Sequence, residues 1–195
     1  MSKEILFATH NAHKAEEVKA LLPPGYSLLT LSDINWTLEI PEPFDTYEEN
    51  AKAKAYFIFD RTGIPCFADD SGLAVDALKG EPGVRSARYA GPGRNSQDNI
   101  DKVLHELSGQ TNRKASFCAV IAYVTANEIQ LFKGIVGGNI TYAPLGDSGF
   151  GYDPIFVPDG FVRTFGQMDS SLKNKISHRA KAMEKFVSFL SEHSR

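Results

Sequence analysis

The chain has 195 residues, 42% of them hydrophobic and 23% charged, and its 21 Lys and Arg against 24 Asp and Glu give a net charge of −3. This composition is typical of a folded globular protein and excludes a disordered chain. The near-neutral charge argues against a protein held to nucleic acid by a large basic excess.

Neither the N-terminus nor any apolar run indicates a membrane protein. The first residues become polar after a few apolar ones, so we expect no signal peptide. The longest uninterrupted apolar run, Phe117–Val124, is far shorter than the roughly 20 residues of a membrane helix. Cys66 and Cys118 lie in apolar stretches without metal or redox spacing, so we expect buried free thiols in a cytoplasmic protein.

The first part of the chain alternates predicted strands and helices. A strand over Ile5–Ala8 leads through a polar turn into a helix that Asn11 caps and that Pro23-Pro24-Gly25 end. The apolar face of this helix consists of Ala15, Val18 and Leu22. A second strand is expected over Ser27–Leu31.

An acidic segment comes next, with six carboxylates and no Lys or Arg from Asp33 to Glu49. Thr46 and Glu49 predict a capping box that starts a second helix, which Gly63 ends. The inner face of this helix is expected to consist of Ala51, Ala55, Ile58 and Phe59. A strand over Cys66–Ala68, a turn over Asp69–Gly72 and a strand over Leu73–Leu78 are expected to follow.

The second half predicts a long hairpin between two helices. The runs Ala115–Val124 and Glu128–Val136 are rich in β-branched and aromatic residues, and the short turn Thr125-Ala126-Asn127 joins them. The preceding helix has Ile100, Val103, Leu104 and Leu107 on one face, and the last helix has Ala180, Met183, Val187 and Leu190. Strands that alternate with helices and then form a hairpin predict an α/β fold with a mixed sheet. We expect one domain over residues 1–195, without a linker.

The turn Thr9-His10-Asn11-Ala12-His13-Lys14 is the first candidate site. A strand that runs through a turn into a helix presents free backbone N–H groups and the positive end of the helix dipole. This arrangement binds phosphate, and the lysine adds a full charge. The alternative is a well-capped helix with a solvated lysine, since the glycines of a P-loop or of a dinucleotide fingerprint are absent.

Acids in two places are candidate metal ligands. Asp69 and Asp70 follow an apolar strand, where adjacent carboxylates are costly unless a cation offsets them. Mg²⁺ takes one or two carboxylates together with phosphate oxygens and water. Glu42 lies between two prolines and is the most rigidly presented acid of its segment, and Lys54 on the next helix is placed to reach a phosphate. An ordinary Asp-rich turn and solvated surface charges are the alternatives.

The remaining candidates lie in the C-terminal third. The loop Ser148–Pro154 alternates glycines with two aromatics, which permits close backbone approach to a ligand and stacking on a base. Ser177 is the expected N-cap of the last helix and places His178 and Arg179 in its first turn. Cations there oppose the helix dipole unless an anion is supplied. The alternatives are a turn that caps the core and a solvated basic face.

Together these segments resemble the inosine triphosphate pyrophosphatase family, the house-cleaning dITP/XTP pyrophosphatases. The matching pieces extend from Phe7 to Arg179, over nearly the whole chain. They are Phe7–Lys14, Thr46–Ala51 with Lys54, Ala68–Asp76, Pro82–Tyr89, Gly149–Pro154 and Ser177–Arg179.

The resemblance implies a homodimeric enzyme with a two-lobed α/β fold around a long central sheet and the nucleotide in a cleft between the lobes. Members convert a nucleoside triphosphate to the monophosphate and pyrophosphate with Mg²⁺, and they prefer 6-oxopurines such as inosine and xanthine. We therefore expect removal of deaminated purines from the nucleotide pool. Two alternatives stay open: a pyrophosphatase for modified pyrimidine nucleotides, and a nucleotide-binding sensor without catalysis.

The resemblance also implies roles for individual residues. Asp70 matches the catalytic acid and, with Glu42, is expected to face the metal, while Ser71 is expected to touch the nucleotide. The phosphates are expected to be held by Thr9, His10, Asn11, Ala12, His13, Lys14 and Lys54. The base is expected to be held by Phe150, Gly151, Tyr152, Asp153, Lys173, His178 and Arg179.

The sequence departs from the family pattern at three places. His10 stands where members commonly have Gly or Ser. Gln167 and Leu172 replace acids that are often found in the segment ahead of the last helices. Pro43-Phe44 replaces the Thr-Gly that usually follows the position of Glu42.

Overall fold

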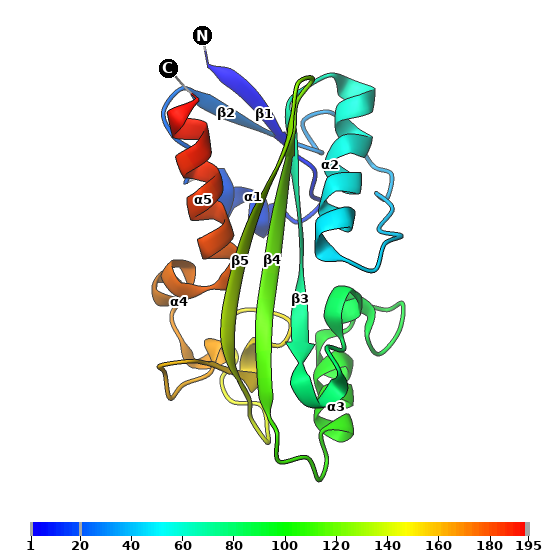
Figure 1. The fold of residues 1–195 in the computed structure, drawn as a ribbon, viewed down its shortest axis with the longest axis vertical. Coiled ribbons are helices and arrows are strands. Elements are labelled where there is room, and N and C mark those ends of the chain that lie inside the picture. The colour runs from blue at the N-terminus through cyan, green and yellow to red at the C-terminus, as the bar shows by residue number, and fades with distance from the viewer. Residues whose placement is uncertain (1, 20, 194–195) are drawn as a thin grey trace. The chain divides into compact units, whose positions relative to one another are not determined.

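The computed structural model describes residues 2–19 and 21–193, and the chain divides into two compact units. Unit 1 is formed by Met1–Asp70, Ala119–Lys133 and Ala182–Arg195. Unit 2 is formed by Ser71–Cys118 and Gly134–Lys181. Each unit therefore combines segments that are far apart in the sequence (Figure 1).

The order of the elements confirms the predicted mixed α/β fold. Among the described residues the strands are β1 (Lys3–Phe7), β2 (Tyr26–Thr30), β3 (Cys66–Val75), β4 (Lys114–Val124), β5 (Ile129–Ile140) and β6 (Phe156–Pro158). The α-helices are α1 (Ala12–Lys19), α2 (Tyr47–Thr62), α3 (Ser96–Glu106), α4 (Ser170–Ile176) and α5 (His178–Glu192). Short 3₁₀ turns cover Asp76–Leu78, Gly83–Arg88, Asp153–Ile155 and Phe165–Gln167.

The strands form a mixed sheet in the order β2-β1-β3-β4-β5-β6. β1 is parallel to β2 and to β3, with Phe7 opposite Thr30 on one side and opposite Phe67 on the other. β6 is antiparallel to β5, and the hairpin between β4 and β5 is closed by the Thr125 N–H, which donates to the Glu128 carbonyl over 3.0 Å. Because β1 and β3 are parallel and in this register, the turn after Phe7 lies beside the residues that follow Phe67.

Unit 1 packs its part of the sheet against α1 and α5. The rings of Phe7 and Phe67 stack with their centroids 4.4 Å apart, and Phe186 of α5 lies 4.9 Å from Phe67. Ala15 and Val18 of α1 are buried in the same cluster, as their spacing predicts. Helix α1 is thus held by its apolar face, and its N-terminal turn stays at the end of β1.

Helix α2 begins and ends where the sequence predicts. The Glu49 N–H donates to Thr46 Oγ1 over 3.2 Å, and the Thr46 hydroxyl in turn donates to the Glu49 carboxylate over 2.7 Å. Gly63 ends the helix with a φ of 68°, in the left-handed region that favours glycine. Ala51, Ala55 and Ile58 are fully buried, whereas Phe59 is half-buried. Within unit 1, α2 and α5 lie on opposite sides of the sheet (Figure 1).

Unit 2 has a core of its own. The ring of Phe117 on β4 lies 4.7 Å from that of Phe156 and 6.2 Å from that of Phe165, measured between centroids. Ile100 and Val103 of α3 and Leu107 at its C-cap are buried in this core, and Leu104 packs against it, as predicted. The side chains discussed below therefore stand on a packed scaffold in either unit.

Strand β3 corrects the predicted turn over Asp69–Gly72. These residues belong to one continuous strand from Cys66 to Val75. Successive side chains of a strand point to opposite faces, so the two carboxylates diverge. Asp69 and Asp70 are only 6% and 8% exposed, and the cations described below allow two buried acids to remain inside a strand.

The C-terminal segment differs from the prediction in its helices. The sequence predicts one helix with Ser177 as N-cap, and the structure has α4 as well, which ends just before Ser177. The N-cap itself is confirmed, because the Ala180 N–H donates to Ser177 Oγ over 3.2 Å. The fully buried residues of α5 include Ala182 and Phe186 besides the predicted Met183 and Leu190, whereas Ala180 and Val187 are half-buried.

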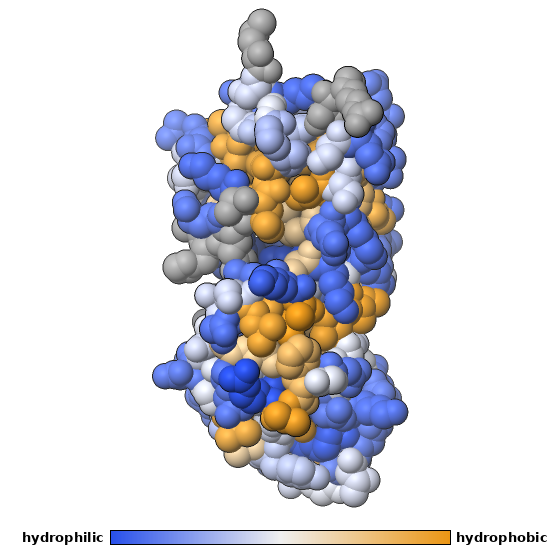
Figure 2. Space-filling model, turned by 90° about the vertical axis from the view of Figure 1, so that its left-hand side faces the viewer, coloured by the Kyte–Doolittle hydropathy of each residue, from blue (hydrophilic) through white to orange (hydrophobic). Residues whose placement is uncertain are grey.

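Cys66 and Cys118 are buried and form no disulfide, as predicted. Among the residues described, no helix has the length and hydrophobicity needed to cross a membrane. Figure 2 shows one face of the molecule, on which exposed apolar side chains gather in patches between hydrophilic ones.

Candidate active site

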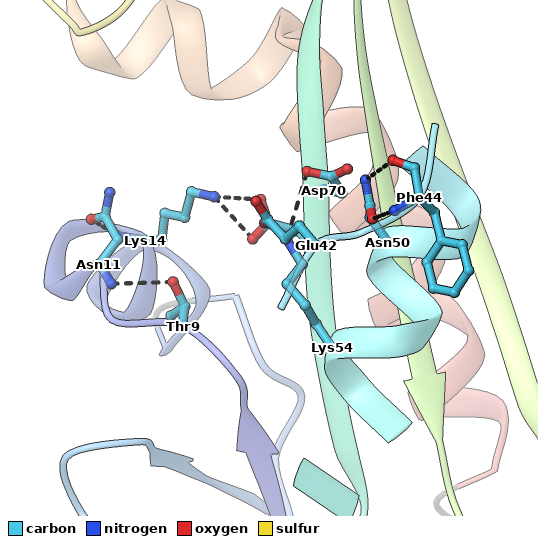
Figure 3. A network of polar contacts seen from close by, with 9 residues as sticks. Thr9, Asn11, Lys14, Glu42, Phe44, Asn50, Lys54 and Asp70 are labelled. Carbon is cyan, nitrogen blue, oxygen red and sulfur yellow. Dashed lines mark hydrogen bonds and ion pairs between the residues drawn. The ribbon is translucent and has the colours of Figure 1, made fainter. Parts of the chain in front are cut away.

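The turn between β1 and α1 is built as a helix N-terminus. Asn11 is the N-cap, because its Oδ1 accepts the Lys14 N–H over 3.1 Å, and the Asn11 N–H donates to Thr9 Oγ1 over 3.2 Å (Figure 3). The N–H groups at a helix N-terminus and the positive end of the helix dipole favour an anion at such a turn. The side chains of Ala12 and His13 lie outside the described residues, so their predicted contacts stay predictions.

Lys14 joins this turn to β3. Its Nζ donates to both carboxylate oxygens of Asp69, over 2.9 Å and 2.7 Å. The Lys14 side chain is 20% exposed and that of Asp69 only 5%. The lysine therefore neutralises a buried carboxylate and still offers a partly exposed positive charge beside the N-terminus of α1 (Figure 3).

On the opposite face of β3, Lys54 lies between two acids. Its Nζ is 2.5 Å from Glu42 Oε1 and 3.6 Å from Asp70 Oδ1. The Lys54 and Asp70 side chains are each 10% exposed, and that of Glu42 is 27% exposed. Helix α2, the acidic loop (residues 31–46) and β3 thus bring one cation and two predicted metal ligands together (Figure 3).

Burial and charge shift the pKa values of this group in one direction. Burial, with the negative charges of Glu42 and Asp69, raises the pKa of Asp70 to about 6, although Lys54 and a hydrogen bond from Asn50 oppose the shift. For Lys54, burial by itself lowers the pKa, but the charges of Asp70, Asp69 and Glu42 outweigh it and the net pKa is raised. Asp70 is therefore a carboxyl that exchanges its proton near neutral pH while Lys54 remains charged.

Asn50 is a member of this site that the sequence reasoning missed. It is 1% exposed, its Oδ1 accepts the Phe44 N–H over 2.9 Å, and its Nδ2 donates to the Phe44 carbonyl over 3.0 Å. Its side chain also hydrogen-bonds Asp70. A polar residue on the inner face of an amphipathic helix, beside the buried Ala51, was the available signal.

The carboxylates of this group suit a hard divalent cation. Asp70 and Glu42 present oxygen ligands, which Mg²⁺ prefers, and Mg²⁺ commonly takes one or two carboxylates and fills its remaining positions with phosphate oxygens and water. Within the described residues, no group of three or more His, Cys, Asp or Glu is placed to hold a metal ion.

A second cluster, in unit 2, surrounds the ring of Phe150. This ring is half-exposed, with Lys173 Nζ 4.6 Å and the Arg179 guanidinium 5.4 Å from its centroid. Asp153 orients the loop, because its carboxylate accepts the Phe150 N–H over 2.8 Å and forms an ion pair with Lys173. Gly149 has a φ of +80°, and a Cβ there would clash with the Asp153 carboxylate, so the loop requires glycine at this position.

Some of the other residues predicted to contact the nucleotide are buried rather than exposed beside the Phe150 ring. His178 is buried and stacks on Phe117, with ring centroids 4.7 Å apart and planes 9° apart. Tyr152 is 4% exposed, and its hydroxyl donates to the Ser86 carbonyl over 2.8 Å. Its ring thus belongs to the core, which was the alternative for this loop. Ser71 is half-buried on β3.

Two departures from the family pattern have structural roles in unit 2. Gln167 forms a capping box with Thr164 at the 3₁₀ turn Phe165–Gln167. Leu172 packs against the core of unit 2. Both residues therefore stabilise the segment that precedes α5, in place of the acids expected there.

Comparison with known proteins yields one family. The model of the Ham1 family matches residues 5–189 of this chain. The chain is 47% identical over 186 residues to the dITP/XTP pyrophosphatase of Flavobacterium psychrophilum, which covers 95% of this chain and 98% of that protein. It is 45% identical over 192 residues to the dITP/XTP pyrophosphatase of Bacillus subtilis, which covers 96% and 97% respectively.

Solved structures agree with this comparison. The Ham1 protein of Staphylococcus aureus matches with a TM-score of 0.93 and 38% identity, over 98% of this chain and 100% of that one. The nucleoside-triphosphatase / dITP/XTP pyrophosphatase of Mycobacterium abscessus matches with a TM-score of 0.81 and 40% identity, over 94% and 98%. The fold expected from the sequence resemblance is thereby confirmed.

Proposed function

This chain belongs to the Ham1 family, and from that premise we propose that it hydrolyses deaminated purine nucleoside triphosphates, such as dITP and XTP, to the monophosphate and pyrophosphate. The relatives that this chain matches over nearly their full length are named dITP/XTP pyrophosphatases. The structural observation that carries the proposal is the group around Lys54, where Asp70 has a pKa of about 6 beside Glu42. Such a carboxyl is suited to proton transfer at neutral pH.

The triphosphate is assigned to the turn from Thr9 to Lys14. The N-terminus of α1, with the positive end of the helix dipole, and the partly exposed Lys14 ammonium supply positive charge there. Lys54 adds a second ammonium that its raised pKa keeps charged. These groups stabilise the negative charge that accumulates on the leaving pyrophosphate.

Asp70 is assigned the role of general base. With a pKa of about 6 it is mostly ionised at neutral pH, yet it remains basic enough to accept a proton from an attacking water. The hydrogen bond from Asn50 and the ion pair with Lys54 hold the carboxylate in one orientation. The water oxygen attacks the α-phosphorus while Asp70 accepts the proton, and the bond between the α-phosphorus and the oxygen that bridges it to the β-phosphorus breaks.

We propose Mg²⁺ as the cofactor, held by Asp70 and Glu42. When bound, it supplies charge neutralisation of the phosphate oxygens. The oxygen donors of Asp70 and Glu42 around Lys54 support this assignment, because Mg²⁺ prefers oxygen ligands.

Base recognition is assigned to the cluster around Phe150. The half-exposed ring offers a stacking surface, and Arg179 beside it supplies hydrogen-bond donors. Donors read the 6-oxo oxygen of a deaminated purine, whereas the 6-amino group of adenine would leave donor facing donor. A buried mismatch of this kind is worth up to about 10⁴-fold in specificity.

The test is product analysis with purified protein, Mg²⁺ and ITP, XTP, ATP and GTP in parallel. We expect monophosphate and pyrophosphate from ITP and XTP, and little from ATP, whose 6-amino group would face the donors. GTP shares the 6-oxo oxygen, so low turnover of GTP would show that its 2-amino group is also discriminated against. Equal turnover of ITP, XTP and ATP would overturn the assigned base pocket, and binding of ITP without products would identify a sensor.

We further propose a homodimer in the cytoplasm. The dimer is supported by the resemblance to the family, and a cytoplasmic location by the two free, buried thiols. Sedimentation equilibrium of the purified protein and cell fractionation test these two points separately.

A further inference from the structure

The acidic loop, residues 31–46, carries Glu42 but contains no helix or strand. Its placement therefore depends on side-chain contacts. On the α2 side these are the Glu42–Lys54 ion pair, the two Asn50 hydrogen bonds to Phe44, and the edge-on packing of Trp36 against Phe57 at 5.8 Å.

The turn from Thr9 to Lys14, to which the triphosphate is assigned above, is called the phosphate turn here. One of its residues, His10, contacts the same loop. His10 Nε2 lies 3.1 Å from the carbonyl oxygen of Leu38, and Trp36 Nε1 donates to that same oxygen over 2.9 Å. A carbonyl oxygen only accepts, and it has two lone pairs, so His10 carries its proton on Nε2 and both rings donate. Leu38 is 67% exposed, so its side chain is not packed in the core. The loop is held at this point by the hydrogen bonds that the Leu38 carbonyl oxygen accepts.

We propose that His10 is a positioning residue whose Nε2–H ties the acidic loop to the phosphate turn and thereby places Glu42 for Mg²⁺. This role differs from the phosphate contact that the family resemblance implies for His10. Gly or Ser, which commonly stand there in the family, have no ring N–H that extends this far. The consequence for Mg²⁺ rests on the proposed function, whereas the tie is a property of the free protein.

The free protein is tested first, by fluorescence. The sequence contains one tryptophan, Trp36, so its emission reports on the acidic loop. We compare acrylamide quenching of the metal-free full-length protein with that of His10→Ala, His10→Gln and His193→Ala. The last is a matched control, because the His193 ring also lies within hydrogen-bond distance of a backbone carbonyl, at 2.8 Å from Phe189 O.

We expect stronger quenching in His10→Ala, wild-type quenching in His193→Ala, and recovery in His10→Gln, whose amide N–H restores a donor. With ITP as substrate, His10→Ala is expected to raise the half-saturating Mg²⁺ concentration by about two- to tenfold, the factor that one net hydrogen bond provides. In the same variant, the KM for ITP at saturating Mg²⁺ is expected to change by a smaller factor than the half-saturating Mg²⁺ concentration.

Unchanged Trp36 quenching in His10→Ala would overturn the tie. A raised KM for ITP with an unchanged Mg²⁺ requirement would overturn the role of His10 in placing Glu42 and identify His10 as a phosphate contact. If wild-type protein turns over no nucleotide, the proposed function fails, and the quenching comparison still decides whether the tie exists.

Discussion

Asp69 and Asp70 are adjacent on β3, yet they belong to different ion pairs: Asp69 contacts Lys14 of α1 within 2.9 Å, and Asp70 lies 3.6 Å from Lys54 of α2. The alternation of side chains along a strand separates them. One strand therefore provides a carboxylate that pairs with Lys14 and another, with a raised pKa, that lies beside Lys54. The two acids are expected to respond differently to the same substitution.

Replacing Asp70 by Asn is expected to lower ITP turnover by about 10²–10⁴-fold, because a general base is removed without a change in side-chain size. Pyrophosphate release measures the loss, and circular dichroism checks the fold. Asp69→Asn, at a neighbouring carboxylate of similar burial, is the matched control and is expected to lose less turnover. Near-full activity of Asp70→Asn would remove Asp70 from the mechanism.

The stability of the metal-free protein is expected to depend on the ionisation of Asp70. Its pKa is about 6 in the folded chain against 3.8 as the ordinary value, so the folded state binds more protons between these pH values. Asp70 therefore favours folding fully below about pH 4, and this contribution is lost as pH rises through about 6. The change amounts to about 3 kcal/mol at most.

Urea unfolding of wild type and Asp70→Asn with a chelator present, at about pH 4 and about pH 7, measures this contribution. The stability of the Asn variant relative to wild type is expected to be greater at the higher pH, because the variant has no carboxylate to ionise. An equal difference at both pH values would contradict the raised pKa.

Asn50→Ala is expected to loosen the acidic loop and to raise the pKa of Asp70 further. The substitution removes the hydrogen bond that lowers this pKa, and it leaves the Phe44 backbone groups without their partner. A loss of about 1–3 kcal/mol in the free energy of unfolding is expected. Carboxyl ¹³C NMR titration of the metal-free protein follows Asp70, and an unchanged or lowered pKa would refute the assigned role of Asn50.

Lys14→Met is expected to destabilise the protein by about 3 kcal/mol, because it leaves the buried Asp69 carboxylate without its ammonium partner. Adding Asp69→Asn is expected to recover much of this stability, since the uncompensated charge is then gone. Binding of pyrophosphate, measured by calorimetry, is expected to stay weak in both variants. Wild-type pyrophosphate affinity in the double variant would show that Lys14 acts only as a structural counterion.

Arg179→Ala is expected to reduce selectivity for the base more than turnover of ITP. The guanidinium lies 5.4 Å from the Phe150 ring centroid, and its loss removes donors for a 6-oxo group. The ratio of kcat/KM for ITP to that for ATP is expected to fall at least about tenfold. Arg61→Ala is a suitable control, because Arg61 also lies over a phenylalanine ring, that of Phe57 at 3.7 Å. An unchanged ratio in Arg179→Ala would exclude this residue from base selection.

Local capping signals in the sequence were sufficient for several helix ends near the site. Asn11, Thr46 and Ser177 cap their helices as predicted, and Gly63 ends α2 in the left-handed region. These signals are reliable because a cap satisfies backbone groups within a few residues of itself. The hairpin of β4 and β5 was predictable for the same reason.

The predictions that were wrong or missing depend on contacts other than these local ones. Two acids followed by Ser and Gly predict a turn, yet Asp69–Gly72 remain in β3 because lysines from two distant helices neutralise the carboxylates. Asn50 was missed because its partners, Phe44 and Asp70, are brought to it only by folding. Both cases depend on contacts between residues far apart in the chain, which no short window of sequence contains.

By itself, the sequence determined the mixed α/β class, the capped helix after β1 and the set of motifs that resembles one family, because patterning, capping and motif order are properties of the chain. Only the tertiary structure decided which lysine faces which carboxylate, that Asp70 has a raised pKa, and that His10 points to the acidic loop. Burial and charge pairing exist only after distant segments pack together, and the chemistry of Asp70 depends on both.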